Sequence, residues 1–286
     1  MKKSGKRKRI LIIAAVAVLL LIAGCVFEVY RSSNHLTVNE YAIDSEKIET
    51  PVKMVIISDL HDHDFKGKLE EMIREQNPDL ILMDGDMING DTEHPEQIYR
   101  LIADLKDTAP VYFAVGNHEK EYMKNHSSFI DEVSKAGCIV LDKEYTDLNI
   151  NGNHIRLGGL YDYPFGKADN KAETASAEIQ SFMNDYLNTE DYKIMLAHRP
   201  DSFIFGDVSQ VYDIDLVVSG HIHGGQVIIP FIGGLYGGDQ GWFPEYDHGL
   251  YDKDKLKLII TSGLGSSKKK LPRFNNIPEI LVLTVR

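Results

Sequence analysis

The stretch VKMVIISDLHDHDFKGKLEEMIREQNPDLILMDGD, from Val52 to Asp86, decides the fold of this chain. It holds two apolar runs rich in Val, Ile and Leu, and a helix-like stretch from Lys66 to Gln76 separates them. A strand, a helix and a second strand in this order form a βαβ unit, whose parallel strands are buried on both faces. The stretch therefore predicts an α/β protein.

The same alternation continues after this unit. Helical patterns are expected from Pro95 to Asp107 and on through Val133, with the strand VYFAV between them. After Cys138 strands dominate (CIVL, HIRLGGL, YKIMLA, IDLVV, KLIITSG and EILVLTV), and one helix is expected from about Lys171 to Leu187. Two sheets packed face to face with helices outside would accommodate both halves. No linker rich in Pro or Gly divides them, which favours one domain over residues 51–286.

Five of the apolar runs end in side chains that can bind metal ions. The clusters are DLH (Asp59, His61), DGD (Asp84, Asp86), GNHE (Asn117, His118, Glu119), HRP (His198) and HIH (His221, His223). Ligands bind outside the carboxyl ends of strands in open α/β sheets, so we expect these clusters to converge on one edge. The sequence thus predicts a metal site there.

The chemistry of these side chains limits the metal. Carboxylate, imidazole and amide ligands without a thiolate suit manganese, iron or catalytic zinc better than a structural zinc site. The ligands are too many for one ion, whereas two divalent ions that share a carboxylate would use them all. Such a pair can hold a phosphoryl group and supply a hydroxide as the nucleophile.

Taken in order, the blocks Asp59-x-His61, Gly85-Asp86, Gly116-Asn117-His118-Glu119, His198 and Gly220-His221-x-His223 resemble those of the calcineurin-like metallophosphoesterases. The resemblance spans residues 52–286. The motifs GHIHGGQ, YGGDQGWFPEYDHGLY and RFNNIPEI are similar to the bacterial membrane-associated branch with YkuE-like and YaeI-like phosphodiesterases. It implies a four-layer αββα sandwich of two mixed sheets and a dinuclear metal centre.

The resemblance also implies a role for each matching residue. Asp59, His61 and His223 would hold the first metal, Asn117, His198 and His221 the second, and Asp86 would bridge the two. His118 would stand beside the leaving group as the general acid, because an imidazole can protonate a departing alkoxide near neutral pH.

One position departs from the family pattern. Many members read Gly-Asp-x-x-Asp, and their second Asp orients the histidine of the GNHE block, whereas this chain has Asn89 there. Since an amide cannot offset the charge of an imidazolium, we expect His118 to be a weaker acid here unless Asp91 substitutes.

Further residues are candidates for supporting roles. His63 and Asp84, like Asn89, are expected behind the metal ligands, where they would orient them. The glycine-rich stretch Gly233 to Trp242 is expected to form a loop near the HIH edge. The candidates for substrate contact are Tyr236, Asp239 and Trp242 from this loop, and Lys269 and Arg273 from the basic run SSKKKLPRF.

The N-terminus predicts an attachment to a membrane. Six cations (Lys2, Lys3, Lys6, Arg7, Lys8 and Arg9) precede eighteen uncharged residues from Ile10 to Phe27. By the positive-inside rule the cations stay in the cytoplasm and the rest lies across the cytoplasmic membrane. Residues 1–27 fit an uncleaved signal anchor or a lipoprotein-type signal that ends at Cys25, and residues 28–50 read as a tether with a first edge strand.

Charge excludes one class of partner. The chain has a net charge of −12, and without the six N-terminal cations the remainder carries −18, so nucleic-acid binding is not expected. The expected function is a metal-dependent phosphoesterase, by resemblance a phosphodiesterase, that acts on a phosphorylated small molecule, lipid or wall polymer of the envelope. A non-catalytic metal-containing envelope protein that binds a phosphorylated glycan or lipid is the alternative.

Overall fold

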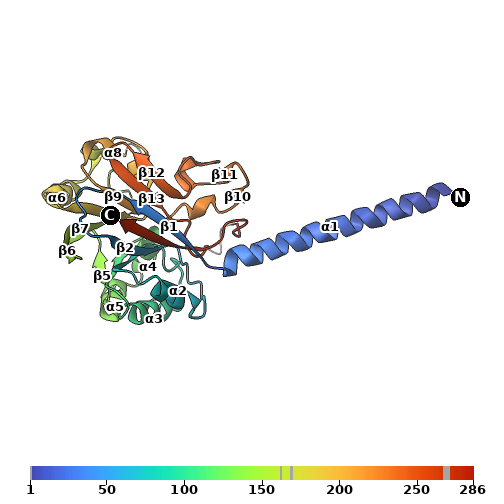
Figure 1. Cartoon of the computed structure of the whole chain (residues 1–286), viewed down its shortest axis with the longest axis horizontal. Coiled ribbons are helices and arrows are strands. Elements are labelled where there is room, and N and C mark those ends of the chain that lie inside the picture. Colours follow the sequence, from blue (N-terminus) through green and yellow to red (C-terminus); the bar gives the residue numbers. More distant parts are fainter. Residues whose placement is uncertain (1, 162, 168–169, 267–270) are drawn as a thin grey trace.

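The computed structural model describes residues 2–161, 163–167, 170–266 and 271–286, with side chains from residue 6 onward. Two six-stranded sheets form its centre (Figure 1). The first has the strand order β1-β14-β2-β3-β4-β5. Its strands are β1 (Thr37–Ile43), β14 (Glu279–Val285), β2 (Val52–Ile57), β3 (Leu80–Asp84), β4 (Val111–Ala114) and β5 (Ile139–Leu141).

The second sheet has the strand order β12-β13-β9-β8-β7-β6. Its strands are β12 (Gly249–Lys253), β13 (Leu256–Ile260), β9 (Leu216–Ser219), β8 (Tyr192–Ala197), β7 (Asn153–Leu160) and β6 (Glu144–Ile150). A separate hairpin joins β10 (Ile228–Ile229) to β11 (Gly233–Gly234). Strands β6 and β12 lie at the two edges and contain polar and charged residues, which is why the search for continuous apolar runs missed them.

Three apolar clusters divide the domain into four layers. Strand residues such as Val55 and Ile57 pack against the helices α2 (Lys68–Glu75), α3 (Glu96–Leu105) and α5 (Phe129–Ala136). Their neighbours Met54 and Ile56 point the other way and fill the space between the sheets. A third cluster joins the second sheet to α6 (Ala177–Leu187), α7 (Asp201–Ile204) and α8 (Val208–Val211). The expected mixed α/β sandwich is therefore confirmed.

The element boundaries differ from the expectation at two places. The single helical pattern through Val133 is two helices, α4 (Asn117–Met123) and α5, and α4 begins inside the GNHE block. The helix expected from about Lys171 begins only at Ala177, after a short 3-10 turn at Ala172–Thr174. Ser176 caps this helix, since its hydroxyl accepts a hydrogen bond from the Ile179 amide.

Helix α1 (Lys2–Asn34) projects from the sandwich (Figure 1). Its part from Lys6 to Asn34 has a mean hydropathy of 3.2 over its most apolar window, and none of that window is buried. It is long and apolar enough to cross a membrane, and such a helix close to the N-terminus is also typical of a signal sequence. The helix continues to Asn34, so the first residues of the expected tether are helical before β1 begins at Thr37.

Candidate metal centre

Tight turns follow the strands that carry the predicted ligands. Five of the seven candidate ligands have φ between 50° and 68°, a left-handed conformation that is costly for residues with a side chain: Asp59, His61, Asp86, His221 and His223. Strained backbone of this kind gathers at functional sites because the surrounding structure holds it in place. Here it turns the side chains of five residues toward one another at one edge of the sandwich.

Two glycines let the turns approach closely. A Cβ on Gly116 would lie 2.4 Å from the amide nitrogen of Asp86, and one on Gly220 would lie 2.1 Å from Oγ of Ser58. Any side chain at either position would push two of the turns apart. The glycines before GNHE and HIH are therefore required by packing between turns.

The first cluster of side chains contains Asp59, His61 and His223. Oδ1 of Asp59 lies 3.3 Å from Nε2 of His223 and 3.9 Å from Nε2 of His61. The two Nε2 atoms are themselves 3.3 Å apart, and the rings stack with an interplanar angle of 17°. Three potential ligand atoms thus converge on one point, and they come from β2 and β9.

The second cluster contains Asp86, His198 and His221. Nε2 of His198 lies 3.1 Å from Oδ2 of Asp86, and the rings of His198 and His221 meet edge to face at 5.3 Å. Asp86 also groups with His61, so its carboxylate borders both clusters. Within the described part of the chain, the buried amide oxygen of Asn117 has no hydrogen-bond partner. Six of the seven predicted ligands therefore lie in two adjoining clusters.

Three of the imidazoles are held by the ring nitrogen that faces away from the clusters. Nδ1 of His61 lies 3.0 Å from Oδ1 of Asn89, Nδ1 of His198 2.6 Å from the Asp84 carbonyl, and Nδ1 of His223 3.3 Å from the Gly265 carbonyl. Each partner is an acceptor, so each Nδ1 carries a hydrogen, and in the neutral ring each Nε2 has the lone pair. This is the tautomer that binds a metal ion.

A nitrogen lone pair and a carboxylate repel each other, so the buried histidines and aspartates of the site favour a positive charge between them. Burial disfavours a charged His198, but Asp86 and Asp59 outweigh that effect and raise its pKa to about 10. The same surroundings hold the pKa of Asp86 well below its ordinary value, although burial opposes this and His198 supplies the main attraction. The donor set, with the unsatisfied oxygen of Asn117, fits divalent cations bound by nitrogen and oxygen.

His118 differs from these histidines in exposure and in tautomer. Its side chain is 23% exposed, and its Nε2 lies 4.0 Å from Oδ2 of Asp86. Its Nδ1 accepts a hydrogen bond of 3.1 Å from the Gly90 amide, so in the neutral ring the hydrogen is on Nε2, which faces the clusters. His118 therefore presents an N–H donor to this edge, whereas the buried histidines present lone pairs.

Asn89 orients His61 rather than His118. Besides its contact with Nδ1 of His61, its amide donates to the His61 carbonyl and to Oδ2 of Asp62. The expectation that Asn89 weakens His118 assumed that Asn89 contacts the His118 ring. In the structure the Gly90 amide contacts Nδ1 of His118 instead. The reason is local geometry, because the turn after Asp86 points the Asn89 side chain at the DLH turn.

The other two residues expected behind the ligands act in different ways. Asp84 holds His198 through its main-chain carbonyl, and its buried carboxyl has a pKa raised to about 8 by burial. The ring of His63 packs on Phe65 at 4.4 Å, and burial lowers the pKa of His63. His63 therefore belongs to the wall of the cavities beside the site.

Glu119 has a structural role that the sequence did not reveal. Its buried carboxylate accepts hydrogen bonds from the amides of Asp86, Met87, Ile88 and Gly116, at 2.7 to 3.2 Å. These bonds join the turn after β3 to the start of α4, which carries Asn117. The signal was present, because a Glu three residues after a helix cap is a known pattern, but its partners come from a different turn.

The glycine-rich loop lies beside the second cluster, because a Cβ on Gly238 would lie 3.7 Å from Nε2 of His221. Tyr236 and Trp242 are 48% and 66% exposed and pack edge to face at 5.3 Å. Asp239 is paired with Arg199, 2.9 Å away, and with the Tyr163 hydroxyl. Asp239 thus anchors the loop, and Arg199, which directly follows His198, is the anchoring residue that the sequence analysis overlooked.

The basic run does not form an exposed patch at Arg273. That side chain is 2% exposed and donates hydrogen bonds to the carbonyls of Gly265 and Ser262 and to the amide oxygen of Asn276. Burial lowers its pKa to about 10. Arg273 thus holds three turns together and is not accessible to a substrate. Lys269 lies outside the described residues.

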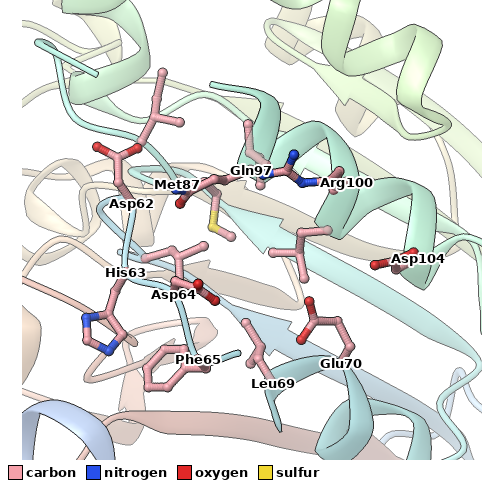
Figure 2. Close-up of a pocket in the computed structure, with 14 residues that line it drawn as sticks. Asp62, His63, Asp64, Phe65, Leu69, Glu70, Met87, Gln97, Arg100 and Asp104 are labelled. Atoms are coloured by element: carbon pink, nitrogen blue, oxygen red, sulfur yellow. The ribbon is translucent and has the colours of Figure 1, made fainter. Parts of the chain in front are cut away.

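Two adjoining cavities open beside the first cluster. The larger, of about 450 Å³, is lined by His61 and His63 together with Asp62, Asn89, Asp91, Thr92, Glu93, His94, Gln97 and Ser266. The smaller, of about 210 Å³, shares Asp62, His63 and Gln97 with it (Figure 2). Figure 2 shows the carboxylates of Asp62, Asp64, Glu70 and Asp104 around this space, with Arg100 among them. Both cavities are rich in acidic groups.

Known proteins share this sequence pattern over most of the chain. The model of the family described as calcineurin-like phosphoesterase matches residues 52–225. An uncharacterized metallophosphoesterase of Campylobacter jejuni is 30% identical over 273 residues, which cover 91% of this chain and 68% of that protein. YkuE of Bacillus subtilis is 29% identical, covering 90% and 88%, and phosphodiesterase YaeI of Escherichia coli is 28% identical, covering 82% of each.

A solved structure shows the same fold at low identity. The sulfate thiohydrolase SoxB of Thermus thermophilus superposes with a TM-score of 0.50 and 11% identity, over 87% of this chain and 57% of that one. Together with the family match, the ordered ligand blocks at one edge of a two-sheet sandwich lead to one conclusion. This chain belongs to the calcineurin-like phosphoesterase family.

Proposed function

We propose that this phosphoric ester hydrolase is a phosphodiesterase of the cell envelope with a dinuclear metal centre. In this proposal Asp59, His61 and His223 hold one divalent ion. Asn117, His198 and His221 hold the other, and Asp86 is shared by both. Manganese, zinc and iron all suit the donor set.

One observation carries the proposal. Three buried imidazoles are fixed through Nδ1 by neutral oxygen acceptors, and their Nε2 lone pairs point at the carboxylates of Asp59 and Asp86. In a structural histidine pair, one ring would donate a hydrogen bond to the other. Here, in each of the two adjacent clusters, the Nε2 atoms face a carboxylate instead. It is the arrangement that two cations would stabilise.

Bound there, divalent cations would neutralise the charge of a phosphate group and lower the pKa of a water molecule. The protein supplies the remaining groups. His118 is positioned to donate its Nε2 hydrogen to an oxygen of the ester, because the Gly90 amide occupies its Nδ1. The Glu119 carboxylate ties the turn at Met87 to Gly116, two residues before His118, which limits the movement of His118.

Two observations favour a diester over a monoester. A relative of similar length is named a phosphodiesterase. The described residues that line the larger cavity include Asp62, Asp91 and Glu93 and no lysine or arginine. A phosphate diester carries one negative charge and a monoester close to two, so the acidic surroundings repel the diester less.

We further propose where the enzyme is located. Residues 1–27 anchor it in the cytoplasmic membrane, residues 28–50 connect this anchor to the catalytic domain, and residues 51–286 form that single domain on the outer side of the membrane. The basic residues before the apolar stretch of α1 support this orientation. Its substrate is then a phosphorylated compound of the envelope.

The test uses the full chain in detergent, stripped of metal and then supplied with Mn²⁺ or Zn²⁺. We expect metal-dependent hydrolysis of bis(p-nitrophenyl) phosphate, with p-nitrophenyl phosphate turned over more slowly. Faster monoester hydrolysis would replace the diesterase by a phosphatase.

A variant of His118 tests the catalytic assignment. For a diester with an alcohol as leaving group, His118→Ala is expected to lower kcat by about 10²-fold to 10⁴-fold. The variant should retain both metals, since the side chain is not among the seven proposed ligands. His126→Ala, at an exposed position after α4, is the control. Turnover unchanged by His118→Ala would refute its role as the general acid. Metal-loaded unaltered protein without any turnover would favour a binding protein instead.

A further inference from the structure

Several exposed large apolar side chains of the sandwich gather near the metal-site edge. The β10–β11 hairpin and the glycine-rich loop expose Phe231 fully and expose Ile232, Trp242 and Phe243 by 64%, 66% and 55%. Leu271, 61% exposed, belongs to the segment that pairs with the hairpin. Clustered apolar exposure of this kind marks an interaction surface, whereas single exposed residues are ordinary. We call these five residues the apolar rim.

The rim is held rigidly. The Ile228 amide donates to the Phe274 carbonyl at 3.0 Å, and the Asn275 side chain donates to the Ile228 carbonyl at 3.1 Å. Phe231 and Phe243 both have left-handed backbones, with φ of 68° and 57°. A bulky residue rarely adopts this conformation because it is strained. The fold nevertheless holds two phenylalanines in it, with their side chains exposed.

The end of helix α1 is linked to the metal site through Asn276. Ser32, fully buried, accepts a hydrogen bond of 3.3 Å from the Asn276 amide. The side chain of Asn276 in turn donates to the carbonyl of His223 at 2.6 Å. Two hydrogen bonds therefore connect the apolar helix to a proposed metal ligand.

The sheet topology places the helix and the site at the same edge. Thr37, three residues after the end of α1, pairs with Glu279, whose amide donates to the Gly263 carbonyl. Gly263 packs on Asp59, because a Cβ there would lie 2.7 Å from Cβ of Asp59. Strand β1 runs parallel to β14 and β14 antiparallel to β2, so β1 begins where β2 ends. Strands are about 4.8 Å apart, so the site lies on the order of 10 Å sideways from the helix exit.

From these observations we infer that the metal-site edge faces the lipid bilayer, that the apolar rim inserts into its interface, and that the substrate is an amphiphilic phosphodiester held in the membrane. Figure 1 shows β10 and β11 on the side of the sandwich from which α1 leaves. Aromatic side chains such as Trp242 favour the interface between lipid and water. The inference rests on the proposed function for the bond that is cleaved, but the orientation stands on the contacts alone.

The orientation can be measured without catalysis. The chain contains a single tryptophan, Trp242, so its fluorescence reports on the rim alone. We would place the full chain in vesicles of phosphatidylcholine and phosphatidylglycerol and replace the phosphatidylcholine with its brominated form. Quenching of Trp242 by the brominated lipid is expected, together with poor quenching by acrylamide in the water. A Trp242 that brominated lipid does not quench would overturn the inference.

The substrate class is tested with two diesters that share a leaving group. Hexadecyl p-nitrophenyl phosphate resides in the vesicle, and ethyl p-nitrophenyl phosphate stays in water. Ile232→Ser is expected to lower kcat/KM for the hexadecyl diester at least about fivefold and to leave the ethyl diester unchanged, because membrane contact scales with buried apolar area. Val211→Ser, on α8 and 53% exposed, is the matched control.

The outcomes separate the two proposals. Equal losses on both diesters in Ile232→Ser, or no loss on either, would refute a role of the rim at the membrane. If the unaltered protein hydrolyses neither diester, the proposed function fails, and the fluorescence of Trp242 still decides the orientation.

Discussion

Single residues set the protonation of the site. Asn89 replaces a carboxylate that many family members have, and its amide accepts from His61 while it donates to Asp62. An amide can do both at once, whereas a carboxylate at this position would repel that of Asp62. An asparagine at position 89 is therefore compatible with the nearby carboxylate of Asp62.

Removing the Asn89 side chain should weaken the metal site. Asn89→Ala leaves Nδ1 of His61 without its acceptor, so we expect the affinity for one metal ion to fall about tenfold to a hundredfold. Titration of the metal-free full chain with Mn²⁺ or Zn²⁺ measures this. Asn125→Ala, at an exposed position, should bind as the unaltered chain does. Equal affinities in both variants would show that Asn89 does not orient His61.

Cys138 should resist alkylation in the folded protein. Burial raises the pKa of its thiol to about 12, and its Sγ lies 3.4 Å from the Val133 carbonyl. A raised thiol pKa means that almost no thiolate forms at pH 8, and thiolate is the reactive species. Iodoacetamide followed by peptide mass spectrometry should find Cys138 modified only after denaturation. Rapid labelling of the native chain at pH 8 would contradict the buried position.

The turns between elements, more than the elements themselves, build the site. The strand ends after β2, β3 and β9 are left-handed, and the carboxylate of Glu119 ties the turn after β3 to the start of α4. Buried amides without acceptors cost free energy, so this one side chain stabilises two turns together.

Replacing Glu119 with glutamine should therefore loosen the turn of Asp86. One amide group would face main-chain donors, and we expect the free energy of unfolding to fall by about 2 to 4 kcal/mol, with a loss of metal occupancy. Thermal unfolding with metal analysis checks both. Glu121→Gln, on the same helix at an exposed position, should change neither. A stable, metal-loaded Glu119→Gln protein would rule out this role.

At the scale of the whole molecule, the site links both sheets. Asp59, His61 and Asp86 follow strands of the first sheet, whereas His198, His221 and His223 follow strands of the second. Ions bound among them would hold the two halves of the sandwich together.

Metal should therefore stabilise the entire domain. A ligand at a hundred times its Kd adds about 2.7 kcal/mol per site to the folded state, so Tm should rise when Mn²⁺ or Zn²⁺ is added to the chelator-treated chain. Asp86→Ala removes the shared carboxylate and should abolish the rise. If added metal does not change the Tm of the unaltered chain, the clusters do not bind ions tightly in the folded state.

By itself the sequence determined the α/β class, the buried strands and the ordered ligand blocks, because apolar runs and the residues that end them are local patterns. It could not determine that Asn89 faces His61, that Glu119 joins two turns, or that Arg273 is buried, because their partners lie on other turns or have no local pattern. The edge strands β6 and β12 were also missed, since their polar and charged residues interrupt any apolar run. Only the tertiary structure decided that α1 enters beside the proposed metal ligands, because strand order and direction follow from packing between distant segments, and no single segment encodes them.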